Sequence, residues 1–258
     1  MPLSPIDVLV LGCDAGHRID VNKRGYVSLL PPRTRVTGDS AAMLEARARF
    51  FDTGAYAPIA AAVSAAGRAV TDARGLRVAE IGCGTGYYLS ALCAALPSSA
   101  PLASDLSPAA VRVAVGAVPG AVGVVLDVWQ PLPLADRSQD VLLSVFAPRN
   151  LAEFARVLDT DGAFLAVVPT GAHLREARAA GLALDVPEGK ADDLIRSADP
   201  WFTLAARTEV EFLMHLEGDS LALLLGMGPS AHHTLAAGQD VPTRVTASVS
   251  VLTFRRRD

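Results

Sequence analysis

The sequence lacks the features of a secreted protein, of a membrane-spanning protein and of a strongly basic nucleic-acid-binding protein. Its 258 residues carry 23 lysines and arginines against 27 aspartates and glutamates, so the net charge is −4 and any nucleic-acid surface must be local. Only three cysteines occur, and an odd number without a secretory signal indicates a reducing cytoplasm. The apolar run near the N-terminus is too short for a signal peptide or a membrane span. We find no internal repeat and no low-complexity tract.

The residues that are present predict one large α/β domain with a small appendage. Apolar residues make up 51% of the chain, enough for a sizeable core. From residue 75 onward short apolar strands alternate with helical segments, which predicts right-handed crossovers and a mostly parallel sheet. Residues 201–216 and 243–257 are long β-patterned stretches around a helix and predict an antiparallel ending. The expected fold is Rossmann-like, with a mostly parallel seven-stranded sheet.

Composition divides the chain into three segments. Residues 1–37 are punctuated by proline and glycine and predict a small irregular lobe. Residues 38–74 predict a helical connection, with Asp39 or Ser40 as the N-cap of its first helix. Residues 75–258 hold the alternating strands and helices, and we expect them to form the main domain.

A glycine turn, "VAEIGCGTGYY", follows the first strand of that domain. Glycines let a backbone turn tightly and let a ligand approach it, and the following helix start supplies free N–H groups. The turn alone is a weak signal, and a glycine turn without a ligand is the alternative. No G-x-x-x-x-G-K-[ST] motif occurs, which argues against a P-loop. The candidate cofactor-binding residues here are Glu80, Gly82, Gly84, Thr85, Gly86 and Tyr87.

Acidic residues at the ends of the next two strands strengthen the cofactor hypothesis. Asp105, followed by Leu106, is expected to accept the two ribose hydroxyls of a nucleoside. Asp127, followed by Val128, is expected to accept from an adenine amino group, with Trp129 as an apolar wall. Each acid also fits the role of a helix cap or turn former. Together with the antiparallel ending, these positions favour S-adenosylmethionine over NAD.

Several blocks then resemble one family in their order along the chain. They are "HRIDVNKRGYVSLLPP", "TGDSAAMLEARARFFDTGAYAPI", "EIGCGTGYY", "DVWQPLPL", "SVFAPRN" and "MGPSAHH". This series resembles the large-subunit (23S) rRNA guanine-N1 methyltransferases, some of which confer macrolide resistance. The resemblance runs from about His17 to the C-terminus. It implies a class I S-adenosylmethionine-dependent methyltransferase that modifies rRNA.

The resemblance also implies cofactor-binding roles for individual positions. Tyr56, Gly86, Tyr87 and His173 match cofactor-binding positions of the family. For Tyr56 the alternative is a core aromatic residue, and for His173 it is a surface histidine at a helix start. A homodimer is compatible with the family, but no residue pattern requires one.

The chain departs from the family in its N-terminal module. That module carries C-x2-C and then C-x3-H and binds zinc, whereas this chain keeps only Cys13 and His17 of the second pair. We therefore expect a degenerate zinc-ribbon-like lobe, a half-site and no bound metal. Basic residues nearby form a local positive stretch that suits RNA or is simply a solvated loop. They are Arg18, Lys23, Arg24, Arg33 and Arg35.

No residue in the sequence is an unambiguous general base for guanine N1. Methyl transfer needs alignment of the acceptor with the methyl carbon, and N1 must also lose a proton. His232 and His233 are candidates for the acceptor pocket, or are solvent-facing. Arg149 would hold a guanine O6 or a phosphate, or is a surface residue. The candidate catalytic residues are Ser144, Arg149, Asn150 and His173.

Three functional hypotheses follow from the sequence. The first is methylation of guanine N1 in large-subunit rRNA. The second is methylation of a small molecule by the same scaffold after loss of the zinc module, which the acidic balance and the missing C-x2-C favour. The third is a cofactor-binding protein without turnover on rRNA. The retained "FAPRN" and "GYVSLL" blocks favour the first.

Overall fold

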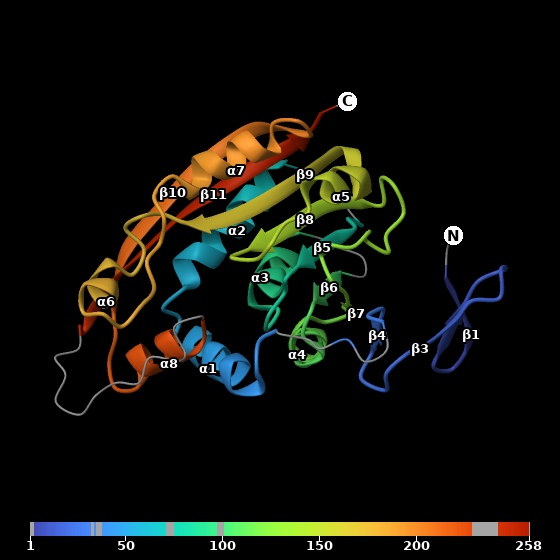
Figure 1. Ribbon diagram of the computed structural model, residues 1–258, viewed down its shortest axis with the longest axis horizontal. Coiled ribbons are helices and arrows are strands. Elements are labelled where there is room, and N and C mark those ends of the chain that lie inside the picture. Colours follow the sequence, from blue (N-terminus) through green and yellow to red (C-terminus); the bar gives the residue numbers. More distant parts are fainter. Residues whose placement is uncertain are drawn as a thin grey trace.

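A mixed sheet of eight strands runs through the computed structural model (Figure 1). The structure describes residues 3–31, 34, 38–70, 75–96, 101–228 and 242–257. The strands follow the order β10-β11-β9-β8-β5-β6-β7-β4 across the sheet. Their bounds are Tyr26–Ser28 for β4, Val78–Ile81 for β5, Leu102–Asp105 for β6, Val122–Val125 for β7, Gln139–Val145 for β8, Leu158–Pro169 for β9, Phe202–His215 for β10 and Arg244–Arg256 for β11.

Most of this sheet is parallel. The strands from β9 to β4 run in one direction, and β11 pairs antiparallel with both β9 and β10. The prediction of a Rossmann-like α/β fold with an antiparallel ending is confirmed. Because the parallel strands share a direction, their carboxyl ends meet at one edge, the place where open α/β sheets bind ligands.

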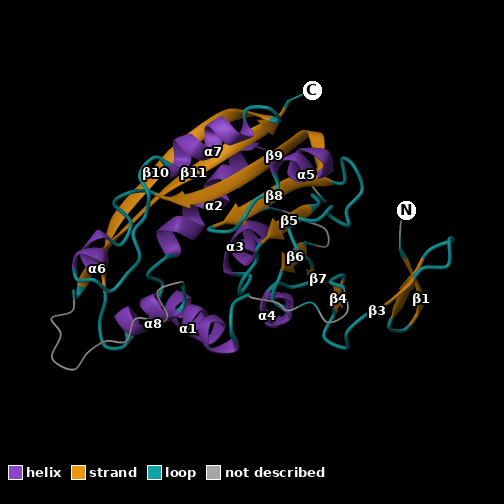
Figure 2. Ribbon diagram, in the orientation of Figure 1, coloured by secondary structure: helices purple, strands orange, loops and turns teal. Residues whose placement is uncertain are grey.

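Helices cover both faces of the sheet (Figure 2). Neighbouring residues of β8 point to opposite faces, and Leu143 and Leu142 accordingly belong to two different apolar clusters. The first cluster joins the sheet to α2, α3, α4 and α8, and the second joins it to α5 and α7. The helices are α1 (Ala41–Asp52), α2 (Ala57–Val70), α3 (Tyr87–Ala95), α4 (Pro108–Ala117), α5 (Leu151–Val157), α6 (Arg175–Ala179), α7 (Lys190–Ala198) and α8 (Ser220–Gly226).

The N-terminal segment contributes a strand to the main sheet. β4 pairs in parallel with β7, so the sheet has one strand more than the seven predicted. A separate three-stranded sheet precedes it, with β1 at Ser4–Asp7, β2 at Val10–Gly12 and β3 at Arg18–Asp20. The division after residue 37 stays a prediction, and β4 ties this segment to the main domain.

The helical connection begins as the sequence predicts. Ser40 has extended backbone and accepts a hydrogen bond from Met43 N at 3.2 Å, so it is the N-cap of α1. Phe50 and Phe51 of α1 are buried in the first apolar cluster. α1 also packs along α8, and the two helices lie side by side in Figure 1.

We expect Gly123→Ala to destabilise the fold by roughly 1–3 kcal/mol, because β4 and α4 together leave no space for a methyl group there. A Cβ at Gly123 would lie 2.6 Å from Tyr26, 2.6 Å from Val111 and 2.7 Å from Val115. Gly116→Ala is the matched control, since nothing lies within 4 Å of its Cβ position in α4. Helix propensity should make the control more stable by roughly 0.5–1 kcal/mol. Urea unfolding of both variants tests this, and equal stabilities would contradict it.

Candidate functional site

The turn after β5 carries three glycines over the carboxyl edge of the sheet. The φ angles of Gly82, Gly84 and Gly86 are 82°, 51° and 78°, in the left-handed region where side chains are strained. A Cβ at Gly82 would also collide with Ala147, which follows β8. Glycine at position 82 is therefore needed twice, for its backbone conformation and for the close approach of the β8 loop. α3 then begins at Tyr87 and supplies free N–H groups.

Asp105 lies beside this turn, at the end of β6. Its carboxylate accepts hydrogen bonds from Gly84 N at 3.0 Å and from Ser107 N at 2.9 Å. Burial raises the pKa of Asp105, and these two bonds oppose the rise. A carboxylate has about four acceptor positions, so capacity for ribose hydroxyls remains. The bond from Ser107 N is the turn-forming role that was the alternative for Asp105 in the sequence. Asp105 lies next to the glycine turn, and its role in ribose binding stays a prediction.

Glu80 lies beneath the turn. Its side chain is 1% exposed and accepts from Leu89 N at 3.2 Å, which holds the first turn of α3. Burial raises the pKa of Glu80 well above its usual range. The contact with Leu89 N gives Glu80 a supporting position, and Thr85 is also buried. Direct contact with a cofactor stays a prediction for both.

The residues predicted after the third strand lie further along the same edge. Asp127 accepts from Trp129 N at 3.0 Å, the turn-forming role that was its alternative in the sequence. The indole of Trp129 is 64% exposed, so it is available as a wall. Leu106 and Val128 are half-buried.

Tyr56 and His173 meet across the site although they are far apart in the sequence. Tyr56 Oη lies 3.2 Å from His173 Nε2, and Ser248 N donates to His173 Nδ1 at 3.1 Å. Because Nδ1 accepts a hydrogen bond there, the neutral imidazole carries its proton on Nε2, and this N–H donates a hydrogen bond to Tyr56 Oη. The hydroxyl proton of Tyr56 is then free to bind an acceptor. The structure brings together these two predicted cofactor residues.

His173 is poorly suited to act as a general base. Burial lowers its pKa to about 4, and both ring nitrogens already take part in hydrogen bonds. Protonation of Nδ1 would place its N–H against the N–H of Ser248. The residue is better described as a neutral donor that orients Tyr56.

Aromatic rings surround the mouth of the glycine turn. Phe51 stacks on Tyr87 with ring centroids 4.2 Å apart. Phe146, which follows β8, lies 5.9 Å from the ring of His173 and 6.5 Å from that of Tyr88. The hydroxyl of Tyr88 is buried without a hydrogen-bond partner among the described residues. Phe146 was not predicted from the sequence as a site residue.

The other predicted catalytic residues have different surroundings. Ser144 is fully buried within β8, and alternation along the strand turns it toward the α5 and α7 face, away from α3. Asn150 is the N-cap of α5 and accepts from Glu153 N. Arg149 donates to Val167 O at 3.2 Å, and its buried Nε has no partner among the described residues. Burial lowers the pKa of Arg149 to about 10.

Arg47 of α1 is a second residue that the sequence did not single out. Its guanidinium pairs with Asp39 and donates to Met227 O at 2.6 Å, so it joins α1, the segment before it and the end of α8. A Cβ at Gly84 would lie 2.8 Å from Arg47 Nη1. The glycine turn thus has a cation directly above it. Asp39 precedes α1 and is eight residues from Arg47, beyond the i,i+3 and i,i+4 spacings that predict side-chain pairs, so no local signal indicated this contact.

The N-terminal half-site contains two potential metal ligands. Cys13 Sγ lies 3.4 Å from His17 Nδ1 in the turn between β2 and β3. Among the residues that the structure describes, no third histidine, cysteine or carboxylate joins them. No helix in the described ranges is long and apolar enough to cross a bilayer. Arg33, Arg35, His232 and His233 lie outside the described residues.

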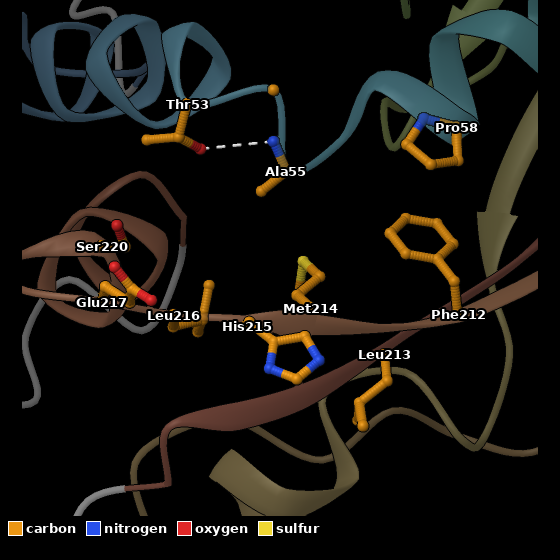
Figure 3. Close-up of a pocket in the computed structure, with 11 residues that line it drawn as sticks. Thr53, Ala55, Pro58, Phe212, Leu213, Met214, His215, Leu216, Glu217 and Ser220 are labelled. Atoms are coloured by element: carbon orange, nitrogen blue, oxygen red, sulfur yellow. Dashed lines mark hydrogen bonds between the residues drawn. The ribbon is translucent and has the colours of Figure 1, made fainter.

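A cavity of about 410 Å³ lies apart from the glycine turn, between the α1–α2 turn and β10. In Figure 3, Phe212 and Met214 point toward Ala55 and Pro58, whereas His215 lies on the other side of the strand. None of the predicted cofactor or catalytic residues lines this cavity. We assign no ligand to it.

Comparison with known proteins agrees with this arrangement. A methyltransferase-domain family matches residues 78–162. The chain is 36% identical to a 23S rRNA (guanine(748)-N(1))-methyltransferase of Streptomyces fradiae, over 86% of the chain and 80% of the relative. It is 41% identical, over 94% of the chain and 84% of the relative, to a Micromonospora griseorubida protein named only provisionally as a 23S rRNA (guanine-N(1)-)-methyltransferase. The chain belongs to the 23S rRNA guanine-N1 methyltransferase family.

The fold has solved counterparts among methyltransferases. A TehB-like S-adenosylmethionine-dependent methyltransferase of Corynebacterium glutamicum superposes with a TM-score of 0.51 at 18% identity, covering 84% of this chain and all of that one. The methyltransferase-domain match and the family membership make this chain an S-adenosylmethionine-dependent methyltransferase. The superposition agrees with its Rossmann-like fold. The positive-φ glycines, the carboxylate of Asp105 and the free hydroxyl proton of Tyr56 fit such a cofactor.

We expect Asp105→Asn to weaken binding of S-adenosylmethionine to the methyltransferase at least about tenfold. The amide loses acceptor capacity for the ribose and for Gly84 N, which also shapes the turn. Asp52→Asn, on the exposed side of α1, is the matched control and should leave affinity unchanged. Isothermal titration calorimetry measures both. An affinity of Asp105→Asn within twofold of wild type would refute its role.

We expect the low pKa of His173 to make the fold less stable in acid. The unfolded histidine has a pKa of about 6.5, so the unfolded chain binds the proton more readily and native stability falls as the pH drops from 6.5 toward 4. The loss between pH 7.5 and 5.0 should be about 2 kcal/mol. Glutamine cannot titrate, so His173→Gln should lack this pH-dependent loss of folding stability. Urea unfolding of both proteins at the two pH values tests this, and identical pH dependence would contradict it.

Proposed function

We propose that this methyltransferase transfers a methyl group from S-adenosylmethionine to N1 of a guanine in 23S rRNA. The observation that carries the proposal is the 36% identity to the Streptomyces fradiae guanine(748)-N(1) enzyme over 86% of the chain. The β8 loop, which contains the family-like "FAPRN" block, contacts the glycine turn at Gly82, and this contact supports it. The oligomeric state and a role in macrolide resistance stay open predictions.

The chain's own residues would align the two reactants. The cofactor supplies an electrophilic methyl group on its sulfonium sulfur. Asp105 would accept the ribose hydroxyls, and the glycine turn would let the cofactor approach the N–H groups at the start of α3. Tyr56, held by His173, would donate its hydroxyl proton to an oxygen of the cofactor. All of these residues belong to one chain, so the proposed reaction does not require a homodimer.

Exposed cations on the N-terminal lobe support an RNA acceptor. Arg18, Lys23 and Arg24 are exposed, and no ion pair within the described ranges neutralises them. Phosphate contacts of this kind supply sequence-independent affinity for nucleic acid. We propose that this surface assists rRNA binding without a four-ligand zinc site. An rRNA acceptor also agrees with the predicted cytoplasmic location.

Methylation of a small molecule is the second candidate. The absence of the first cysteine pair and the net charge of −4 favour it. In that case the exposed cations of the lobe would have no part in turnover, and their replacement would leave the rate unchanged.

Methylation of 23S rRNA fragments with labelled S-adenosylmethionine separates the candidates. We expect label on one guanine, and mass mapping should place it on N1. A variant with Arg18, Lys23 and Arg24 changed to glutamine should bind the RNA more weakly and with a shallower salt dependence. Cofactor binding without any transfer to rRNA would refute the rRNA proposal and leave the small-molecule one.

A further inference from the structure

Phe146 combines an unfavourable backbone conformation with an exposed ring. It follows β8 at the carboxyl edge of the sheet, with a φ of 52°, which is rare for a residue other than glycine. Its side chain is 42% exposed although it is large and apolar. Strain of this kind persists where surrounding contacts enforce it, and it is concentrated at functional sites.

Arg149, three residues later, is a largely buried cation without a carboxylate partner among the described residues. Its Nη2 donates to the backbone oxygen of Val167, and its Nε is buried and unpartnered. No carboxylate in the described part of the chain forms an ion pair with it. Burial of a charge without a partner is costly, which suggests that a ligand completes the pairing.

The loop that carries both residues is fixed beside the cofactor turn. The Val167 carbonyl accepts from Phe146 N at 3.1 Å as well as from Arg149. Ala147, between them, lies against Gly82 so closely that no Cβ fits there. Two otherwise unexplained features, the exposed ring and the unpaired cation, therefore occupy one rigid loop next to the proposed methyl donor.

We propose that residues 146–149 form the guanine-binding site, with the Phe146 ring stacked on the base and the Arg149 guanidinium bound to O6. This inference rests on the proposed function and assigns the acceptor site within it. Aromatic rings are common stacking partners of RNA bases that have left the helix. An arginine guanidinium is likewise a common partner of guanine O6.

The same arrangement removes the need for a general base. Guanine N1 gives its proton to solvent water, and the resulting negative charge is shared between N1 and O6. The guanidinium stabilises this anion through O6 in a partly water-excluded site. N1 then forms a bond to the methyl carbon while the methyl–sulfur bond breaks and its electron pair stays on sulfur. The products are N1-methylguanine and a neutral thioether.

The pH dependence of Arg149→Met tests the electrostatic role. Methionine keeps most of the apolar volume and removes the charge. We expect the rate on rRNA at pH 7 to fall at least about 100-fold while cofactor affinity stays within twofold. The deficit should shrink as the pH rises to 9.5, because hydroxide then generates the N1 anion without help. Arg149→Lys should recover part of the rate.

The controls exclude a general loss of structure. Arg112→Met removes an exposed arginine from α4 and should retain the wild-type rate. Unchanged cofactor affinity of Arg149→Met by calorimetry shows that the site is folded. A deficit that is constant across pH, with a raised KM for RNA, would indicate a phosphate contact and overturn the proposal. So would a wild-type rate at pH 7, or loss of cofactor binding together with rate.

Phe146→Leu tests the stacking contact independently. Leucine retains apolar bulk but not the ring, so we expect RNA affinity to fall roughly 5- to 150-fold with no change in cofactor affinity. Phe146→Tyr keeps the ring and should bind RNA like wild type. Equal RNA affinity of the leucine and tyrosine variants would refute stacking.

The wild-type assay separates this proposal from the one it rests on. Absence of rRNA methylation by the wild-type enzyme would overturn the proposed function itself. Guanine-N1 methylation by wild type, with unaltered rates in both Arg149→Met and Phe146→Leu, would overturn only the acceptor site.

Discussion

The contact between Gly82 and Ala147 is the constraint on which the rest of the site depends. No Cβ fits between them, so the turn after β5 and the loop after β8 lie in direct van der Waals contact. Methyl transfer relies mainly on the alignment of donor and acceptor, and this contact would fix the proposed acceptor loop relative to the cofactor turn. Val167 O, which binds both ends of the β8 loop, holds the other side.

A second constraint concerns protons. His173 is central to the site, yet its two nitrogens are committed to Ser248 N and Tyr56 Oη, and its pKa is far below neutral. For the proposed transfer to guanine N1, a site with a neutral histidine has to stabilise the N1 anion in another way. The unpaired charge of Arg149 is suited to this, because its field is not cancelled by a neighbouring carboxylate. Burial makes His173 a poor base, because it disfavours the protonated imidazole. Burial of Arg149 strengthens the electrostatic interaction of its guanidinium with an anion.

The sequence predicts the features that are encoded locally. Strand alternation predicted the parallel sheet and its antiparallel end, and the glycine motif with Asp105 predicted two parts of the site that lie in contact. Pairing of β4 with β7 could not be predicted, because a three-residue strand carries little pattern and its partner is distant in the sequence. Helix α7 was also missed. The strain at Phe146 and the missing acid at Arg149 are properties of tertiary contacts, whereas their neighbours Ser144 and Asn150 drew attention only by position.

The loss of two zinc ligands from the N-terminal lobe is only weak evidence against an RNA acceptor. The Cys13–His17 turn is closed by its own backbone, through Cys13 N to His17 O at 3.2 Å and Gly16 N to Cys13 O at 2.9 Å. Leu11 and Ile19 on the flanking strands pack against the second apolar cluster. The hairpin therefore has packing and hydrogen bonds that do not depend on metal, unlike small domains that fold only when zinc binds. Arg18, Lys23 and Arg24 remain exposed on or next to this hairpin, so phosphate contacts are available although the whole chain has a net charge of −4.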